Sequence, residues 1–371
     1  MMDSLPCGGA EKSLISLLPF LAERDYKITL MLKVRGGLFE RYVPSAVKIV
    51  TFPYKSSLLH RVFYSISLRL PWNRKRHSAE LYWSCIGRYW PDLKEEYDVA
   101  IAYQQGFPTF YISEKVYAIK KFCWVNTDLK AAGYSPLFCA PFYKKYNRIA
   151  AVADSLVERL VQNGFCNADK IFVVLDILNE SLIREMAADK EIFLKKGDVW
   201  HITTVGRLVA PKGYDIAIDA AKIMKEKGVN FVWHIVGGGQ LQEGLSQSIE
   251  EYGLTGSVIL EGEKLNPYPY IRCCDIYVQT SKFEGFGLTV GEAKILGKPI
   301  VSTNFPVIYN QISDGQNGLV VEMTGEAVAN GIMRLITDPD LKDRLVDNVL
   351  KEHNTTAETE SAKVIQFIEE Q

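Results

Sequence analysis

The sequence predicts an α/β protein built from two doubly wound domains, each with a parallel sheet covered by helices. Short apolar segments typical of strands alternate with helix-periodic segments along most of the chain. A length of 371 residues is enough for two domains of ordinary size. An apolar content of 47% with 23% charged residues is typical of a globular protein and excludes a disordered one.

The second half of the chain shows this alternation most clearly. The segment V-W-H-I-T-T-V at 199–205 is a strand that ends at Gly206, and F-V-W-H-I-V at 231–236 is a buried strand that ends at three glycines. Further strands are expected at 257–260, 275–279, 299–303 and 318–321, and helices at 214–226, 241–252, 268–273, 287–296, 326–336 and 341–351. Ligands of such sheets bind at the carboxyl ends of the strands.

The first half follows the same order with longer gaps. Strands are expected at 27–32, 47–51, 98–102, 121–125, 148–153 and 170–174, and helices at 10–22 and 155–162. The polar stretch 187–198 marks a junction, so we expect domains at 1–188 and 189–354, followed by a last helix within 355–371. Only 1–7 precede the first Gly-Gly turn, so either the first strand is very short or the chain as given starts late.

Charge is distributed unevenly along the chain. Residues 1–190 carry 26 Lys+Arg against 19 Asp+Glu, whereas residues 191–371 carry 17 against 25. No acidic residue occurs from 41 to 79, a segment with eight basic residues.

Within that segment an amphipathic helix is predicted, because Leu59, Val62, Phe63, Ile66 and Leu70 recur at helical spacing. Its other side carries basic residues, and a basic loop follows it; the candidates for an anionic surface are Arg61, Arg69, Arg74, Lys75 and Arg76. Two interpretations stay open: contact with an anionic membrane or a phosphorylated lipid carrier, or a core-facing helix whose basic side is merely solvated. Nucleic-acid binding is disfavoured because no recognition motif accompanies the patch.

Metal, redox and secretion signals are missing from the sequence. The seven cysteines include no C-x-x-C pair, and the five histidines fit no metal-ligand spacing; His201 and His234 lie in apolar strands and are expected in the core. There is no apolar run of about 18 residues and no basic-then-apolar leader, so we expect a cytoplasmic protein.

Two loops after predicted strands carry the residue types of a diphosphate and sugar site. Gly206 and Arg207 follow the strand 199–205, and Lys212 stands just before the next helix; an Arg fork and a Lys charge suit phosphate oxygens. The run S-K-F-E-G-F-G-L-T-V-G-E at 281–292 places Glu284 in a loop and Glu292 about two turns into a helix. A carboxylate there can accept both hydroxyls of a ribose, and the loop amides and helix start can hold an anion.

Taken together, these motifs resemble those of the family 4 glycosyltransferases. The resemblance rests on Gly206-Arg207 with Lys212, the Gly237–Gly239 turn, the E-x7-E spacing from Glu284 to Glu292, and Gly8-Gly9-Ala10-Glu11-Lys12 at the front. The segments K-L-N-P-Y at 264–268 and N-G-L at 317–319 are also similar to the family.

The resemblance implies a GT-B fold: two Rossmann-like domains facing across a cleft, with the acceptor on the N-terminal domain and the nucleotide-sugar on the C-terminal one. It implies that Arg207 and Lys212 hold the donor diphosphate, that Glu284 contacts the donor sugar near its reacting carbon, and that Glu292 binds the ribose. Further implied donor contacts are Gly206, Gly237, Lys264, Gly285, Phe286, Gly287, Leu288 and Thr289; Gly8 and Gly9 would approach the phosphate or acceptor. Members retain anomeric configuration and need neither a metal nor another cofactor, which suits two fixed cations facing the leaving group.

One residue departs from the family pattern. Many members have a His after the strand that reads K-F-C-W-V here, but this chain has Asn126, which can hydrogen-bond a sugar but cannot carry a proton. We therefore expect a retaining transferase that moves a sugar from a nucleotide-diphosphate sugar, most simply a UDP-sugar, to a lipid-linked saccharide in polysaccharide assembly, with peripheral contact to the inner membrane face. The alternative is a non-catalytic sugar-binding or stabilising partner of another glycosyltransferase.

Overall fold

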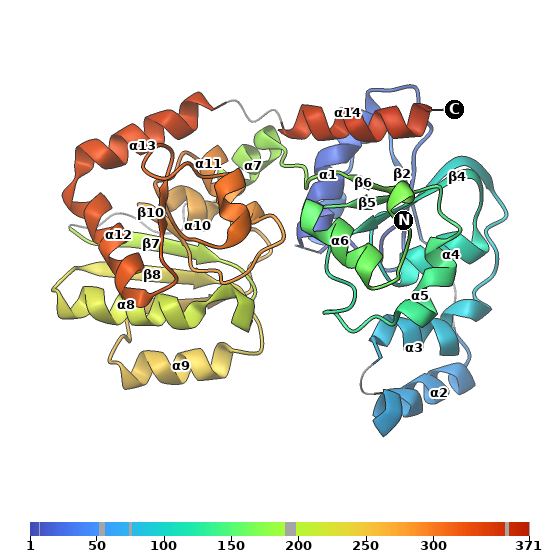
Figure 1. Cartoon of the computed structure of the whole chain (residues 1–371), viewed down its shortest axis with the longest axis horizontal. Helices are drawn as coiled ribbons and strands as arrows, with labels where there is room; N and C mark the ends of the chain where they lie inside the picture. Colours follow the sequence, from blue (N-terminus) through green and yellow to red (C-terminus); the bar gives the residue numbers. More distant parts are fainter. Residues whose placement is uncertain (7, 52–55, 74–75, 190–197, 353–355, 371) are drawn as a thin grey trace. The chain divides into compact units, whose positions relative to one another are not determined.

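The computed structural model describes residues 1–6, 8–51, 56–73, 76–189, 198–352 and 356–370. The chain forms two compact α/β units, Met1–Ile177 with Thr356–Gln371, and Leu178–Thr355 (Figure 1). The expected fold class is thus confirmed. The division falls after residue 177, not after 188 as expected, because α7 (Glu180–Ala187) packs on two helices of the second unit, α10 and α11.

The second unit is built on a six-stranded parallel sheet of order β12-β11-β10-β7-β8-β9. The order reverses at β7, so the sheet is doubly wound as predicted. Its strands are β7 (Trp200–Val205), β8 (Phe231–Val236), β9 (Val258–Gly262), β10 (Ile276–Gln279), β11 (Ile300–Thr303) and β12 (Leu319–Val321). Its remaining helices are α8 (Tyr214–Glu226), α9 (Gln242–Glu251), α10 (Tyr268–Cys273), α11 (Leu288–Ile295), α12 (Gly325–Thr337) and α13 (Pro339–Lys351).

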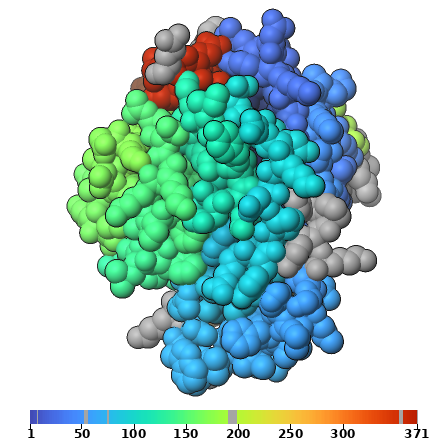
Figure 2. All heavy atoms as spheres, turned by 90° about the vertical axis from the view of Figure 1, so that its right-hand side faces the viewer, coloured from blue at the N-terminus to red at the C-terminus, as the bar shows by residue number. Residues whose placement is uncertain are grey.

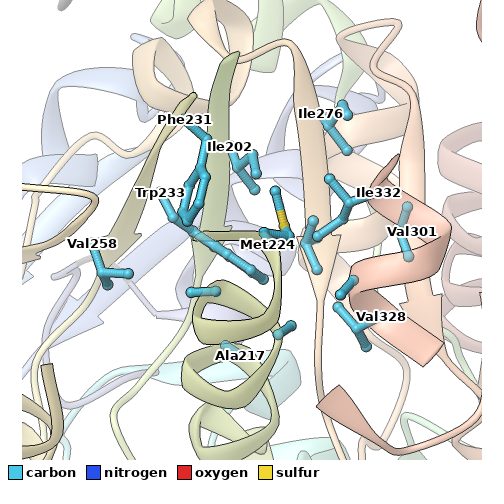
Figure 3. Close-up of a cluster of buried hydrophobic side chains, with 14 of the residues drawn as sticks. Ile202, Ala217, Met224, Phe231, Trp233, Val258, Ile276, Val301, Val328 and Ile332 are labelled. Carbon is cyan, nitrogen blue, oxygen red and sulfur yellow. The ribbon is translucent and has the colours of Figure 1, made fainter. Parts of the chain in front are cut away.

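The core of the second unit lies between one face of this sheet and helices α8, α9, α12 and α13. Trp233 of β8, Met224 of α8 and Ile332 of α12 meet there (Figure 3), and all three are fully buried. Helices α10 and α11 pack on β7 and β11 without contributing to this cluster, so they cover the other face. Burial of this apolar surface holds the strands, and therefore the loops at their ends, in fixed places.

The first unit carries a four-stranded parallel sheet, β3-β4-β5-β6, and a two-stranded parallel pair, β1-β2. Met1 and Met2 join the two: Met2 bridges Leu32 in parallel, its N–H donates to the Met31 carbonyl at 3.1 Å, and the Met1 carbonyl accepts from the Tyr103 N–H at 3.0 Å. These two residues thus connect the strand pair to the sheet. The strands are β1 (Thr29–Leu32), β2 (Lys48–Thr51), β3 (Glu96–Ala102), β4 (Tyr117–Val125), β5 (Arg148–Ala151) and β6 (Ile171–Val173).

Helices of the first unit include several that the sequence analysis did not predict. Helices α1 (Gly9–Ala22), α6 (Asp154–Gln162) and α2 (Leu58–Arg69) lie where helices were expected, whereas α3 (Ser78–Cys85), α4 (Phe107–Lys115) and α5 (Pro136–Tyr143) were missed. The last helix, α14 (Thr356–Glu369), packs on α1, and Tyr26 Oη donates to Glu369 at 2.6 Å. The first unit is therefore completed by a segment from the end of the chain (Figure 1).

Candidate active site

The candidate site of the second unit lies at the carboxyl ends of β7 and β10. These adjacent parallel strands flank the point where the strand order reverses, which is where doubly wound sheets bind ligands. Gly206 and Arg207 follow β7, and the loop from Thr280 to Gly287 follows β10. The two loops that were predicted to contain the diphosphate- and sugar-binding residues therefore start from the same edge of the same sheet.

Lys212 and Glu284 join these two loops by an ion pair. Lys212 Nζ lies 2.6 Å from Glu284 Oε1, and the side chains are 21% and 10% exposed. The backbones touch as well, because the Lys282 N–H donates to the Pro211 carbonyl at 2.8 Å, and Thr280 Oγ1 donates to the Lys212 carbonyl at 3.1 Å. Gly213 has φ +63°, and a Cβ there would lie 2.0 Å from the Thr280 carbonyl oxygen, so only glycine allows this approach.

Glu284 is held by two further donors that the sequence analysis missed. Ser281 Oγ and Gln279 Nε2 donate to the same Oε1, at 2.6 and 2.8 Å. Gln279 is 1% exposed, and its own Oε1 accepts from Tyr277 Oη at 2.8 Å and from Thr289 Oγ1 at 3.1 Å. The sequence signal for this role was Gln279 itself, a polar residue at the end of an otherwise apolar strand.

The start of α11 follows directly after Glu284. Gly287, with φ +86°, precedes the helix, and Gln311 Nε2 fixes the turn by donating to the Phe286 carbonyl at 2.5 Å. The first-turn N–H groups, including those of Leu288 and Thr289, have no partner within a helix, and the helix dipole makes this end favourable for negative charge. Gly285 is exposed, and a side chain there would meet no atom.

Glu292 sits in different surroundings from Glu284. It is 0% exposed within α11, and its Oε1 accepts a hydrogen bond of 3.0 Å from Tyr268 Oη, also buried. The structure thus places the two carboxylates of the E-x7-E spacing on one loop-helix unit, but joins only Glu284 to Lys212. The ribose contact of Glu292 stays a prediction.

Arg207 and the glycine turns complete this edge of the sheet. Arg207 is exposed, and its side chain makes no ion pair or hydrogen bond with any residue that the structure describes. Gly237 has φ +153°, and a Cβ there would lie 1.9 Å from the Gly206 carbonyl oxygen. The Leu208 N–H donates to the Gly238 carbonyl at 2.9 Å. Close packing of two loops therefore explains the three-glycine turn.

Lys264 is tied to a buried polar network. Its Nζ lies 3.7 Å from Glu261 Oε2, and Glu261 also contacts His234 Nδ1 and accepts from Tyr270 Oη, both at 2.9 Å. Burial acts to raise the pKa of Glu261, but these hydrogen bonds outweigh it and the pKa is lowered. His201 Nδ1 lies 3.2 Å from His234 Nε2, and both rings are buried, so the prediction that they are core histidines is confirmed.

The predicted acceptor-side residues all lie in the first unit. A Cβ on Gly8 would lie 2.1 Å from Glu11 Oε2, so this glycine makes room for a carboxylate at the start of α1. Burial raises the pKa of Glu11. Asn126 follows β4; its N–H donates to Gln105 Oε1 at 3.2 Å and its Nδ2 to the Tyr103 carbonyl at 3.3 Å. Gly8 is therefore explained by packing, whereas a phosphate or acceptor contact of Gly8 and Gly9 stays a prediction.

Helix α2 turns its apolar side outward, so the second of the two interpretations, a core-facing helix, is wrong. Leu59 and Phe63 are 80% and 65% exposed, and Leu58, Val62 and Ile66 are exposed as well. The helix packs on α3 through its polar side: Ser67 is buried, and Tyr64 meets Tyr82 edge-to-face at 5.5 Å. Figure 2 shows α2 and its neighbours, in lighter blue, on the surface at one end of the first unit.

The structure describes three of the five basic residues predicted near α2. Arg61 and Arg69 are exposed on the helix. Arg76 is partly engaged within the first unit, because its Nε lies 3.5 Å from the buried Glu80 and its guanidinium lies over Phe138 at 5.4 Å. Arg74 and Lys75 lie outside the described residues.

The described residues include neither a metal-ligand cluster nor a membrane-spanning helix. No three His, Cys, Asp or Glu side chains within those ranges are grouped as metal ligands would be. None of the helices in the same ranges combines the length and apolar character needed to cross a bilayer. Metal independence and location stay predictions.

Comparison with known proteins gives one consistent result. Residues 185–352 match the family model of the glycosyl transferases group 1. The chain is 23% identical over 341 residues to the lipopolysaccharide core biosynthesis glycosyltransferase LpsE of Rhizobium meliloti, covering 92% of this chain and 89% of LpsE. It is 26% identical over 221 residues to the capsular polysaccharide biosynthesis glycosyltransferase CapM of Staphylococcus aureus, covering 57% of this chain and 56% of CapM.

Among solved structures, Anabaena HepE in complex with UDP and glucose has a TM-score of 0.70 at 18% identity, covering 100% of this chain and 98% of HepE. That likeness shows the fold, and it agrees with the parallel sheets of the two units described above. The resemblance drawn from the motifs is confirmed at this level: residues 185–352 match the group 1 glycosyltransferases, and the chain has the GT-B fold.

Proposed function

We propose that this protein transfers a hexose-type sugar from a UDP-sugar to a saccharide acceptor during assembly of a cell-surface polysaccharide or lipopolysaccharide. The names of LpsE and CapM support a role in polysaccharide or lipopolysaccharide biosynthesis. The UDP bound to HepE supports uracil as the base of the donor nucleotide. The first unit would receive the acceptor and the second unit the donor.

The observation that carries this proposal is the Lys212–Glu284 pair at the reversal point of the second sheet, with Arg207 on the same edge. Breaking the bond between sugar and diphosphate leaves negative charge on the diphosphate. An ammonium has three N–H donors, so Lys212 can keep Glu284 and still donate to a phosphate oxygen. Arg207 adds a planar fork for a second oxygen, and the start of α11 adds backbone donors.

The finer part of the proposal is that the transfer retains the anomeric configuration of the sugar and needs no metal ion. The two cations Arg207 and Lys212 stabilise the leaving group in the way that a divalent ion would. Attack from the face that the diphosphate leaves lets a phosphate oxygen take the proton of the acceptor hydroxyl, so no histidine base is needed. Glu284, held by Lys212, Ser281 and Gln279, is then a fixed negative charge beside the reacting carbon.

We further propose that the acceptor is linked to a lipid and that α2 brings the protein to an anionic membrane surface, at the cytoplasmic face. The apolar side of α2 is exposed, Arg61 and Arg69 flank it, and no acidic residue occurs from 41 to 79. Trp72, just after the helix, is 73% exposed. An exposed apolar stripe with basic neighbours and an aromatic end is the pattern of a helix that lies in a membrane interface.

The experiment compares donor hydrolysis and UDP binding in the wild-type protein with those of Arg207→Ala and Lys212→Ala. Removal of one such charge is expected to lower the turnover of a UDP-sugar by about 10²–10³-fold. Arg184→Ala is the control, because Arg184 makes an ion pair of 2.8 Å with Glu180 outside the site loops and both side chains are about half exposed. Equal activity in all variants would contradict the assignment.

Two arms of the same experiment test the finer claims. Activity that survives EDTA is expected if no metal takes part. The anomeric configuration of the product, read by NMR, is expected to match that of the donor. If no UDP-sugar is turned over and no nucleotide binds, the catalytic proposal is wrong and a non-catalytic partner role replaces it.

A further inference from the structure

The first unit contains a pocket that the sequence motifs did not indicate. It has a volume of about 350 Å³ and lies where the strands of the first sheet end. Asp3 follows the bridging residue Met2, Lys33 follows β1, Gln104 follows β3 and Thr127 comes two residues after β4. The carboxyl ends of parallel strands thus converge on this pocket, at the low end of the usual size range for small-molecule sites.

Two opposite charges line this pocket without pairing with each other. Asp3 Oδ1 is buried and has no hydrogen-bond partner among the described residues. Lys33 Nζ lies 3.8 Å from the centre of the Tyr82 ring and 4.5 Å from that of Phe107. Burial raises the pKa of Asp3, opposed by the charge of Lys33, and burial lowers the pKa of Lys33, opposed by Asp3. The two charges therefore attract each other through space, but they do not form an ion pair in direct contact.

Much of the remaining wall is aromatic, with Tyr64, His77, Tyr82, Phe107 and Tyr134 in the lining. The His77 ring stacks on Tyr134 with 3.8 Å between centroids, and the Ala79 N–H donates to His77 Nδ1 at 3.2 Å. Nδ1 is therefore the acceptor, and the neutral ring keeps its proton on Nε2 as a donor. Burial lowers the pKa of His77, which keeps the ring neutral near pH 7.

We infer that this pocket binds a neutral pyranose residue of the acceptor, held between the carboxylate of Asp3 and the ammonium of Lys33. A hydroxyl group both donates and accepts, so neighbouring sugar hydroxyls can donate to Asp3 and accept from Lys33. The C–H faces of a pyranose then lie against the aromatic side chains. An anionic ligand would leave the Asp3 carboxylate without a hydrogen-bond donor. An apolar ligand would leave both the carboxylate and the Lys33 ammonium without a hydrogen-bond partner. The inference rests on the proposed function, because it names the acceptor for that reaction.

The experiment measures binding of neutral methyl hexopyranosides (gluco, galacto, manno and N-acetylglucosamine forms) to the full chain by saturation-transfer NMR. At least one is expected to bind, and Asp3→Asn and Lys33→Met are each expected to weaken it about tenfold or more, because hydrogen bonds to charged groups are lost. UDP affinity, measured on the same samples, should not change. Asp340→Asn and Lys351→Met, at exposed positions of α13, are the matched controls.

Three results would overturn the inference. One is that UDP binds but no neutral glycoside does, which leaves the proposed function standing. Another is that glycosides bind equally well to the Asp3 and Lys33 variants, both shown to be folded by their melting curves. The third is that inorganic phosphate competes for the pocket and needs Lys33 but not Asp3. Glycoside binding that needs Asp3, in a protein that binds no nucleotide, would instead support the pocket and refute the proposed function.

Discussion

The side-chain amide of Gln279 donates a 2.8 Å hydrogen bond to Oε1 of Glu284, the atom that also receives Lys212. The same amide accepts from Tyr277 and Thr289, so one buried glutamine connects the end of β10, the Glu284 loop and the first turn of α11. Every hydrogen bond of this amide is used in holding the candidate site.

Gln279→Leu is therefore expected to lower turnover of a UDP-sugar by about 10- to 100-fold, because Glu284 loses one of its supports. Gln279→Glu places a second carboxylate beside Glu284, so its activity should recover partly as pH falls and that group is protonated. This pH profile separates a positioning role from a merely structural one. Gln247→Leu, which removes an exposed hydrogen bond on α9, is the control. A Gln279→Glu variant with the wild-type pH profile would refute the role.

Removing the apolar side of α2 is expected to abolish membrane binding. Burial of a large apolar side chain is worth about 1.5–3 kcal/mol, so Phe63→Ser with Ile66→Ser should weaken binding to vesicles of anionic phospholipid more than tenfold. Co-sedimentation at low and high salt would measure this, with salt reducing the part due to Arg61 and Arg69. Leu137→Ser is the control, since Leu137 is 93% exposed on α5 and stands apart from α2. Sedimentation of the double variant at the wild-type level would contradict the surface assignment.

Asp176 makes folding stability depend on pH. Burial raises the pKa of Asp176 to about 7, although a hydrogen bond with Ser13 acts to lower it. Because the folded state holds this proton more tightly than the unfolded chain, the stabilisation is complete below about pH 4 and is lost as pH rises to about 7. Asp176→Asn is thus expected to raise stability at pH 8 by more than it does at pH 5, with an upper limit of about 4 kcal/mol.

Urea unfolding of both proteins at the two pH values measures this effect. Asp340→Asn, on an exposed turn of α13, should shift stability equally at both. A variant less stable than wild type at pH 8 would show that the Asp176 carboxylate is stabilised rather than penalised by its surroundings.

Gly237→Ala is expected to damage both folding and donor binding. The new Cβ would lie 1.9 Å from the Gly206 carbonyl oxygen, which is backbone and must shift. We expect a loss of about 2–4 kcal/mol in the free energy of unfolding and weaker UDP binding, because Arg207 moves with Gly206. Gly228→Ala is the control: φ is +74°, but no atom lies within 4 Å, so only the backbone strain remains. Equal losses in the two variants would show that the loop contact is unimportant.

Strands of the second sheet were predictable because they are buried on both faces. The expected strands at 199–205 and 231–236 agree with β7 and β8 to within a residue, since each is a continuous apolar run ended by glycine. Helices α3, α4 and α5 were missed because they are short and bear aromatic residues on several sides, so no helical period stands out. Trp83, Phe107 and Phe142, for example, pack together in space across these three helices.

The candidate site was predictable only where a loop follows a recognisable strand. Arg207, Lys212 and Glu284 could be found this way, and the structure joins the last two. The role of Gln279 could not, because it depends on partners on the next helix and on the orientation of an amide. The exposed side of α2 was predicted only as one of two interpretations, because helical spacing gives the apolar side but not the direction it faces.

The link that Met1 and Met2 make has a consequence for the order of folding. The pair β1-β2 and the sheet β3–β6 are each made of neighbours in sequence, whereas Met2 bridges Leu32 and Met1 must reach Tyr103, about a hundred residues away. Closing such a long loop costs conformational entropy, and the contacts of Met1 and Met2 offset that cost only after both parts have formed. Amide exchange during refolding should therefore protect the β3–β6 strands first and the Met2 amide last, with the pocket of Asp3 and Lys33 assembled in that final step.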